Sequence, residues 1–497
     1  MTPTPASSVL VARRPGSPEV FLVERSPALR FMGGMVAFPG GKVHEDDEVV
    51  ARPGVGLTTR HVAAVRELFE ETGVLLARRP DGSFPTPTAD LDRFRTMLLD
   101  NAVLFSAMLE ATGLHLDAGD LSPAGHLVTP PFSPLRFDTA FFVATLPPGQ
   151  EAAVWNGELT RGWWATADEE LGRWRQAESM LTPPTVSILS ALEGRPVAEL
   201  PGRMRPLLDQ LDRGRVPPIW VSPGVMMVPL DCQGLPPTTH TNTLLVGTGP
   251  VYLIDPGPTD AGEQERLFEI ADECRPAAIV LSHHHPDHVG AANEAARRYG
   301  IPVLAHRLTA DLLRDKVRVD RFLEDGEELD LGEAPHGRGR WSMRAVFTPG
   351  HAPGHLAFYV PDYRLVLAGD MLSTLSSLII HPDDGDVALY LDSLRRLKTY
   401  PTRLLLPAHG GPTTKATKVL DETIAHRVER ERQLVEALAA RPRTVEELAL
   451  ELYRGFPESV LKLARWQLLA GLIKLEREGR AARSGPHWRS PDTQARP

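Results

Sequence analysis

Four histidines and one aspartate occupy six consecutive positions of this chain, in the run His283-His284-His285-Pro286-Asp287-His288. The apolar stretch 278–281 before the run predicts a buried strand, and the alanine-rich stretch 290–296 after it predicts a helix. A loop between two such elements can bring several imidazoles to one point. The first and third histidines are therefore predicted to share one metal ion, while the aspartate and the last histidine turn toward a second.

Three more candidate ligands follow downstream, each after a short apolar stretch: His351, Asp370 and His409. Because each follows a predicted strand, these side chains are expected to gather with the histidine run along one edge of a sheet. The alternative is a polar loop with surplus histidines, and that alternative does not account for the downstream partners. The sequence therefore predicts a site for two metal ions.

The order of these motifs resembles that of the metallo-β-lactamase superfamily. The shared segments are the H-x-H-x-D-H run, the G-H-x-P-G-H segment at 350–355, the Gly-Asp pair at 369–370 and the Pro-Ala-His-Gly turn at 407–410. The resemblance spans residues 215–420 and implies an αββα sandwich with two zinc ions. It assigns His283, His285 and His351 to one zinc, Asp287, His288 and His409 to the other, Asp370 to both, and a supporting role to Asp255.

The ligand types predict the chemistry. Neutral imidazoles leave a zinc ion most of its positive charge and an open position, so a bound water ionises near neutral pH. Two such ions, expected roughly 3.5–4 Å apart, also stabilise charge that develops on a substrate oxygen. The predicted reaction is hydrolysis of an ester, thioester or phosphodiester. We expect Asp287 to orient the attacking hydroxide, His355 to donate a hydrogen bond behind the ligands, and His284 to face away from the metals.

A second cluster lies upstream, where Glu67, Glu70 and Glu71 are spaced to share one face of a helix. Like charges this close repel unless a cation lies among them. Carboxylate oxygens favour magnesium or manganese, and these ions in turn favour phosphate substrates. The alternative is an exposed acidic helix face, but a glycine-rich turn at 38–43 precedes the helix, which stops at Gly73.

Residues 66–74 resemble the Nudix box, R-E-U-x-E-E-x-G-U with U a bulky aliphatic residue, at every specified position. The resemblance implies that the three glutamates bind magnesium or manganese and that Arg66 holds a carboxylate in place. The stretch from Gly41 to Arg66 is longer than in the usual box, and which acid at 45–48 replaces the upstream glutamate of the family is left open. The segments 22–26, 30–32 and 38–41 and the strand expected at 136–143 resemble the branch that cleaves the diphosphate of coenzyme A and acyl-coenzyme A, a resemblance that covers roughly residues 5–200.

The end of the chain is predicted to be helical. Helices are expected from Asp421 and from a capping box at Thr444, and a third is lined by leucines within 461–475, before a basic hairpin tip at 479–485. Three helices and a short hairpin resemble a winged helix. Together with the preceding domain, this tail resembles the small branch typified by the β-lactamase-like endoribonuclease of mitochondria, some members of which cut single-stranded RNA. Residues 421–490 hold thirteen Lys and Arg against eleven Asp and Glu, so RNA contact is left open.

The sequence thus predicts a multidomain α/β protein. A Nudix-like α/β/α sandwich with a helical insertion is expected at 1–205, a metallo-β-lactamase domain at 206–420 and a winged-helix-like domain at 421–497. The proline-punctuated stretch 201–223 is interpreted as the connection between the first two. The formal net charge of −10 argues against general binding of polyanions.

Cysteine content and hydropathy exclude several other classes of protein. Cys232 and Cys274 form no CxxC pair, which leaves a disulfide framework and a thiol zinc site unsupported. No apolar run reaches the length of a membrane span and the first residues lack an export signal, so a cytoplasmic protein without membrane partners is expected. The expected partners are small-molecule ester, thioester or diphosphate substrates, with single-stranded RNA and an oligomer left open.

Two alternatives to a pair of active hydrolases remain. One is an endoribonuclease on single-stranded RNA whose Nudix domain serves only for binding. The other is a regulatory nucleic-acid-binding protein with vestigial sites. The complete set of candidate zinc ligands argues against the second alternative, and the complete set of Nudix glutamates argues against the first.

Overall fold

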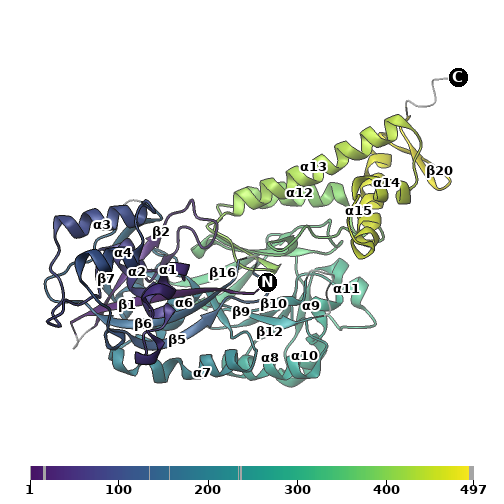
Figure 1. Ribbon diagram of the computed structural model, residues 1–497. Coiled ribbons are helices and arrows are strands. Elements are labelled where there is room, and N and C mark those ends of the chain that lie inside the picture. Colours follow the sequence, from purple (N-terminus) through teal and green to yellow (C-terminus); the bar gives the residue numbers. More distant parts are fainter. Residues whose placement is uncertain are drawn as a thin grey trace. The chain divides into compact units, whose positions relative to one another are not determined.

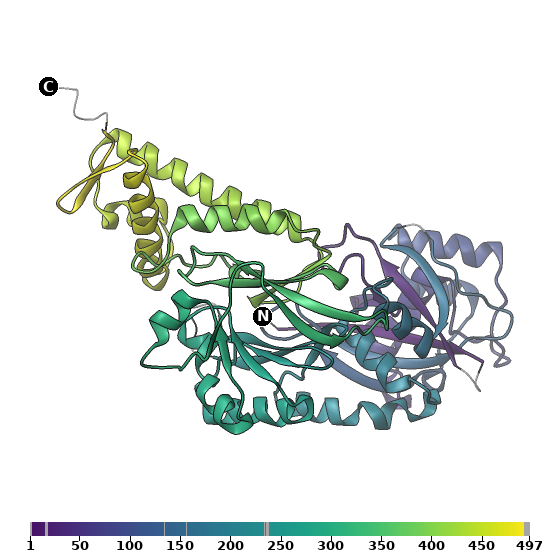
Figure 2. The same cartoon turned by 180° about the vertical axis from the view of Figure 1, so that it is seen from behind.

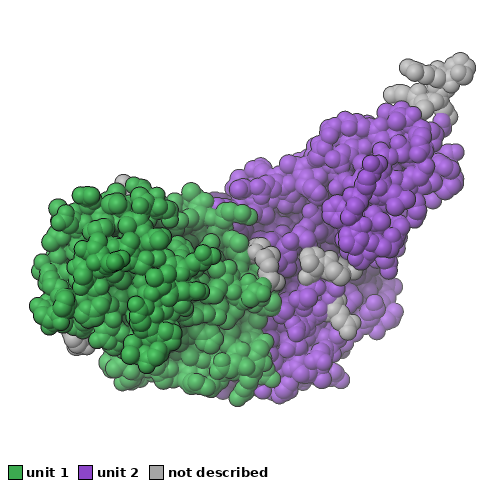
Figure 3. Space-filling view, in the orientation of Figure 1, with its two compact units in different colours: residues 1–223 green, residues 224–497 purple. Residues whose placement is uncertain are grey.

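The computed structural model describes residues 2–14, 18–133, 135–155, 157–232, 234 and 238–491. The chain divides into two compact units, residues 1–223 and 224–497 (Figure 3). The first residue and the last six, which belong to the expected first and third domains, lie outside the described residues. Within the described ranges, every helix is too short or too polar to cross a membrane.

The first unit is built on a mixed sheet (Figure 1). Its strands are β1 (Thr4–Arg13), β2 (Glu19–Arg25), β3 (Val36–Ala37), β4 (Gly40–Lys42), β5 (Ser122–Val128), β6 (Phe137–Thr145) and β7 (Leu159–Thr166). The order is β3-β2-β1-β6-β5, with β4 paired to β1 and β7 paired to β2. β1 runs parallel to β6, whereas β2 is antiparallel to both β1 and β7. A short strand, β8 (Ile219–Ser222), precedes the unit boundary.

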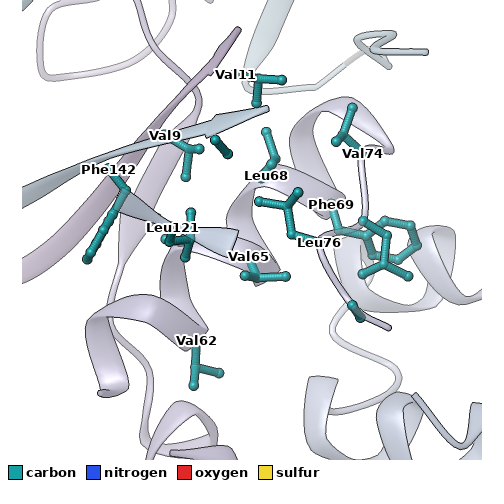
Figure 4. Close-up of a cluster of buried hydrophobic side chains, with 14 of the residues drawn as sticks. Val9, Val11, Val62, Val65, Leu68, Phe69, Val74, Leu76, Leu121 and Phe142 are labelled. Carbon is teal, nitrogen blue, oxygen red and sulfur yellow. The ribbon is translucent and has the colours of Figure 1, made fainter. Parts of the chain in front are cut away.

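Helices cover both faces of this sheet. They are α1 (Glu45–Val50), α2 (Thr59–Thr72), α3 (Ala89–Leu99), α4 (Phe105–Thr112), α5 (Ala167–Arg175), α6 (Pro183–Leu192) and α7 (Leu200–Asp212), with single 3₁₀ turns η1 (Pro53–Val55), η2 (Ala118–Asp120) and η3 (Val197–Glu199). Because side chains alternate along a strand, Val9 and Val11 of β1 enter one apolar core with α2, while Leu10 enters a second core with α5 and α6. Figure 4 shows the first of these cores. The predicted α/β/α sandwich is confirmed.

The second unit contains two sheets. The first is formed by β9 (Val225–Asp231), β10 (His240–Val246), β11 (Tyr252–Ile254), β12 (Ala278–Leu281), β13 (Val303–Ala305) and β14 (Arg321–Phe322), in the order β14-β13-β12-β11-β10-β9. The second is formed by β15 (Glu328–Glu333), β16 (Arg340–Phe347), β17 (Leu356–Val360), β18 (Leu365–Ser373) and β19 (Leu404–His409), in that order. Leu244 and Ile254 of the first sheet share a small buried space with Phe358 and Leu367 of the second, so the sheets pack face to face.

Helices form the two outer layers of this sandwich (Figures 1 and 2). α8 (Ala261–Cys274) and α10 (Ala292–Tyr299) pack on the first sheet, and α12 (Val387–Lys398) and the start of α13 (Ala416–Ala440) pack on the second. The remaining short elements are α9 (Pro286–Val289), α11 (Arg307–Leu313) and the turn η4 (Pro361–Tyr363). The predicted αββα order of layers is confirmed.

The end of the chain forms a winged helix, as predicted. α14 (Val445–Leu452), α15 (Glu458–Arg477) and the hairpin of β20 (Ala482–Ser484) and β21 (His487–Arg489) pack with the end of α13 around one apolar core that contains Trp488. α13 begins at Ala416 rather than Asp421, because its first turn packs on the second sheet. The stretch predicted as the hairpin tip contains β20, and the turn lies at Gly485, whose φ of 57° favours glycine.

Candidate metal sites

Three of the predicted histidine ligands converge on one point at the ends of strands. His285 Nδ1 lies 2.9 Å from His283 Nε2 and 3.0 Å from His351 Nε2. Together with Asp370, they present ligand atoms that all lie within 4.8 Å of one another. Zinc–nitrogen bonds of about 2.0–2.1 Å place tetrahedral ligand atoms about 3.3 Å apart, so this group has the dimensions of a zinc site.

The second predicted group lies beside the first. Asp287, His288 and His409 also present ligand atoms within 4.8 Å of one another. Asp370 reaches both groups, because its Oδ1 lies 3.2 Å from His409 Nε2 and its Oδ2 lies 3.3 Å from His351 Nε2. The structure therefore brings all seven predicted ligands together, with one carboxylate between two groups.

The ring nitrogen of each ligand histidine that points away from this centre has a hydrogen-bonding partner. The pairs are His283 Nδ1 with Ser282 Oγ (3.0 Å), His285 Nε2 with Asp384 Oδ2 (3.2 Å), His288 Nδ1 with Asp255 Oδ2 (2.9 Å), His351 Nδ1 with the Ile379 carbonyl (3.1 Å) and His409 Nδ1 with the His240 carbonyl (3.0 Å). Such partners fix the tautomer and the ring orientation of a metal-binding histidine. The inward nitrogens are thus prepared to bind a cation.

Two predicted supporting residues lie directly behind the ligands. Asp255 accepts hydrogen bonds from the backbone amide (2.7 Å) and the hydroxyl (2.5 Å) of Ser282, in addition to its contact with His288. His355 contacts Thr348 Oγ1 through Nδ1 (2.8 Å) and accepts a hydrogen bond from the backbone amide of Asp370 (3.0 Å). His355 therefore holds the bridging aspartate by its backbone rather than by its carboxylate.

The charge balance of the site fits divalent cations. Burial lowers the pKa of His283 and His351 well below the usual range, so both rings are neutral at pH 7. Burial also disfavours the charged form of His288, but the charges of the surrounding carboxylates, Asp370 first, raise its pKa well above the usual range. Among the described residues, buried His288 Nε2 and Asp370 Oδ1 make no well-aligned hydrogen bond, although His409 Nε2 lies 3.2 Å from Asp370 Oδ1. Metal ions held at this site would supply the positive charge that balances these carboxylates.

Asp384 is a site residue that the sequence did not indicate. Its Oδ2 lies 3.2 Å from His285 Nε2 and 3.1 Å from His284 Nε2. His284 thus faces Asp384, on the far side of His285 from the metal ligands. The segment Pro382-Asp383-Asp384-Gly385 has the composition of an ordinary turn, and only the tertiary fold distinguishes Asp384 from its neighbour.

In the first unit, α2 presents the three predicted glutamates beside the glycine turn. Arg66 Nη1 lies 2.8 Å from Glu67 Oε1 and 3.6 Å from Glu70 Oε1, and the Gly40 amide donates a 2.8 Å hydrogen bond to Glu71. Gly41 packs against Glu67 so closely that an added Cβ would lie 2.3 Å from the Glu67 carboxyl carbon. The glycine turn and the helix therefore form one compact carboxylate cluster.

Asp47 is the acid of the 45–48 stretch that forms an ion pair with Arg66. Its carboxylate accepts two hydrogen bonds from Arg66, at 2.9 Å from Nε and 3.1 Å from Nη2, and its side chain is fully buried. The resemblance implied that Arg66 holds a carboxylate, and the structure pairs it with Asp47.

The glutamate cluster also needs a cation. Burial, then the charge of Glu67, raises the pKa of Glu70 to about 7. Burial raises the pKa of Glu67 as well, against the opposing charge of Arg66, and raises that of Glu71 well above its usual range. Clustered oxygen ligands of this kind suit magnesium or manganese.

Comparison with known proteins gives three family matches, in the predicted order along the chain. The NUDT19 Nudix domain matches residues 53–192, the metallo-beta-lactamase superfamily matches residues 236–409, and the beta-lactamase associated winged helix domain matches residues 444–488.

Individual proteins resemble the two larger domains. The lactamase-like protein adaB of Aspergillus niger is 30% identical over 240 residues, which are 44% of this chain and 70% of that protein. The atrochrysone carboxyl ACP thioesterase of Aspergillus fumigatus is 28% identical over 225 residues, 44% of this chain and 66% of that protein. A crystal structure of a NUDIX hydrolase from Alicyclobacillus acidocaldarius is 33% identical and covers 40% of this chain and 95% of its own, with a TM-score of 0.37.

The family matches confirm the two family resemblances and the hydrolase class that the motifs predicted. The chain belongs to the metallo-β-lactamase superfamily and is a hydrolase that carries a Nudix domain before the superfamily domain and a winged helix after it.

Proposed function

We propose that the second unit is a two-zinc hydrolase of carboxylic thioesters or esters. The observation that carries this proposal is the convergence of two ligand groups on the two oxygens of Asp370. The relative named as an atrochrysone carboxyl ACP thioesterase supports the thioester class. His283, His285 and His351 would hold one ion, Asp287, His288 and His409 the other, and Asp370 both.

The chain's own residues supply orientation and proton handling. Zinc bound at this centre supplies a water-derived nucleophile at neutral pH and a Lewis acid. Asp287 is the most accessible member of its ligand group, with 15% of its side chain exposed against 0% for His288 and 4% for His409. Its carboxylate therefore orients the attacking water by accepting a hydrogen bond, while the buried imidazoles keep bulk water away.

Phosphodiester cleavage in single-stranded RNA has weaker support. Two arginines of the C-terminal domain are paired with carboxylates of the same chain, Arg477 with Asp386 and Arg480 with both Glu431 and Glu478. Phosphate contacts would have to break these pairs first. Thioester or ester hydrolysis is therefore the preferred activity.

For the first unit we propose a magnesium- or manganese-dependent diphosphatase that acts on a nucleoside or coenzyme A diphosphate. The cluster of Glu67, Glu70 and Glu71 supports this proposal, since three carboxylates gather on α2 beside Arg66 and the glycine turn. The buried pair of Arg66 and Asp47 keeps the cluster in position.

We also propose a cytoplasmic location for the protein and domain boundaries at 205/206 and 420/421.

Two substitutions test both activities at once. His285→Ala removes a ligand of the first zinc group and is expected to lower thioester hydrolysis by roughly a hundredfold or more, since metal stabilisation of the transition state contributes several kcal/mol. Glu70→Gln is expected to lower magnesium-dependent release of phosphopantetheine from coenzyme A to a similar extent. Both reactions are measured on each variant, so each variant is the matched control for the other.

The activities that each variant loses decide between the proposed functions. Unchanged thioester turnover in His285→Ala would refute the zinc mechanism. Failure of the wild-type chain to cleave coenzyme A and nucleoside diphosphates alike would leave the first unit as a binding module. Cleavage of single-stranded RNA that is lost in His285→Ala, without thioester turnover in the wild type, would establish the alternative substrate.

A further inference from the structure

The winged helix binds a loop of the metallo-β-lactamase domain. This loop, residues 378–386, is the part of the connection between β18 and α12 that directly precedes α12. From α15, Gln467 Oε1 accepts a 3.1 Å hydrogen bond from the Ile380 amide, and the Trp466 ring lies 4.7 Å from that of His381. From α13, Arg427 donates to the Leu378 carbonyl.

The other side of the same loop contacts the metal ligands. The Ile379 carbonyl accepts a hydrogen bond from His351 Nδ1, and Asp384 accepts one from His285 Nε2. These are the ring nitrogens that point away from the metal centre. A proton held on each of them leaves His351 Nε2 and His285 Nδ1 with the lone pairs that a metal needs.

One peptide plane connects the winged helix to the candidate metal ligand His351. The Ile379 carbonyl and the Ile380 amide belong to the same peptide unit, which is planar and rigid. Gln467 binds the amide end of this unit and His351 binds the carbonyl end. Ile380 is fully buried and Gln467 is 8% exposed, so solvent does not readily replace either contact. The orientation of the His351 ring is therefore coupled to the position of α15.

We propose that the winged helix is a positioning element of the metal centre, which acts through the 378–386 loop. Gln467 is the positioning residue for His351, and Asp384 is the positioning residue for His285. The inference rests on the proposed zinc centre. It gives the C-terminal domain a role within its own chain that requires no nucleic acid.

Zinc affinity of the full-length chain tests the coupling. The dissociation constant is measured by competition with a chromophoric chelator in excess magnesium, which occupies the Nudix cluster. Gln467→Met keeps the side-chain length but removes the acceptor oxygen, and we expect it to weaken zinc binding by about tenfold, at the lower end of the effect of losing such partners. Gln467→Glu retains an oxygen at the same reach and is expected to restore most of the affinity.

A matched control lies two residues away on α15. Arg465 pairs with Glu446 and Glu458, which lie outside the loop, so Arg465→Met is expected to leave zinc affinity unchanged. Asp384 gives an independent comparison, because Asp384→Asn keeps an acceptor for His285 whereas Asp384→Ala removes it. Circular dichroism and the Tm of each variant separate loss of affinity from loss of fold.

The outcomes of these measurements are distinguishable. If the wild-type chain binds no zinc, the proposed function itself fails. If the wild type binds zinc and folded Gln467→Met binds it equally well, the positioning role of the winged helix is wrong. Should Gln467→Met fail to fold, Gln467→Asn decides in the same way, because its shorter side chain withdraws the oxygen while leaving a polar group in place.

Discussion

At the scale of single residues, the candidate metal ligands could be predicted because each lies in a motif within or just after a short apolar strand. Asp384 could not, since it meets His285 across a sequence separation of 99 residues and stands in an ordinary turn. Asp47 is an intermediate case. The four consecutive acids at 45–48 left the choice open, and only burial in the fold distinguishes Asp47.

Glu70 gives the residue-scale prediction. Its folded-state pKa of about 7 lies above the ordinary 4.5, so the folded unit retains a proton that the unfolded chain releases. The resulting stability is fully present below the ordinary pKa and is lost as pH rises through 7. Without magnesium, the Tm of the first unit is expected to fall across this window, by ~2–4 °C per kcal/mol.

Thermal unfolding between about pH 5 and 8 checks this sign. Glu70→Gln, which does not titrate, should show a flatter dependence, and magnesium should remove the decline by replacing the proton. If the Tm of the wild type showed the same dependence on pH as that of Glu70→Gln, the assignment of the pKa shift to the Glu70 carboxyl would be wrong.

At the scale of elements, helix starts were well predicted where capping chemistry is local. The capping box of Thr444 and Glu447 is present at the start of α14. The start of α13 and the position of β20 were predicted less well, because one depends on packing against a distant sheet and the other on a turn at a single glycine. The layers themselves followed from the succession of apolar strands and helices.

The turn at Gly350 gives the element-scale prediction. Its φ is 129°, and an added Cβ would lie 2.2 Å from the backbone nitrogen of Tyr390 in α12. Gly350→Ala is therefore expected to destabilise the second unit by about 1–3 kcal/mol and to weaken zinc binding through the adjacent His351. Chemical denaturation measures the loss, with Gly411→Ala as the control, since an added Cβ there meets no atom within 4 Å. Equal stability of the two variants would contradict the predicted clash.

At the scale of the whole molecule, the proposed function gives the two compact units different metal chemistry. Scanning calorimetry of the full-length chain is expected to show two transitions. Magnesium should raise one of them and zinc the other, because each ion stabilises only the folded unit that binds it. Glu70→Gln and His285→Ala should each abolish one of these shifts and leave the other. A single transition that both ions raise would show that the units unfold as one.

The 25-residue helix α13 belongs to two cores, because Ala416 and Leu420 pack with the second sheet while Leu434 and Leu438 pack inside the winged helix. Residues 416–440 are helical throughout, so this segment offers no hinge for the C-terminal domain. A premature stop codon or a protease cut within it would strip apolar partners from both cores at once. For this chain, loss of the C-terminal domain would therefore also destabilise the metallo-β-lactamase domain.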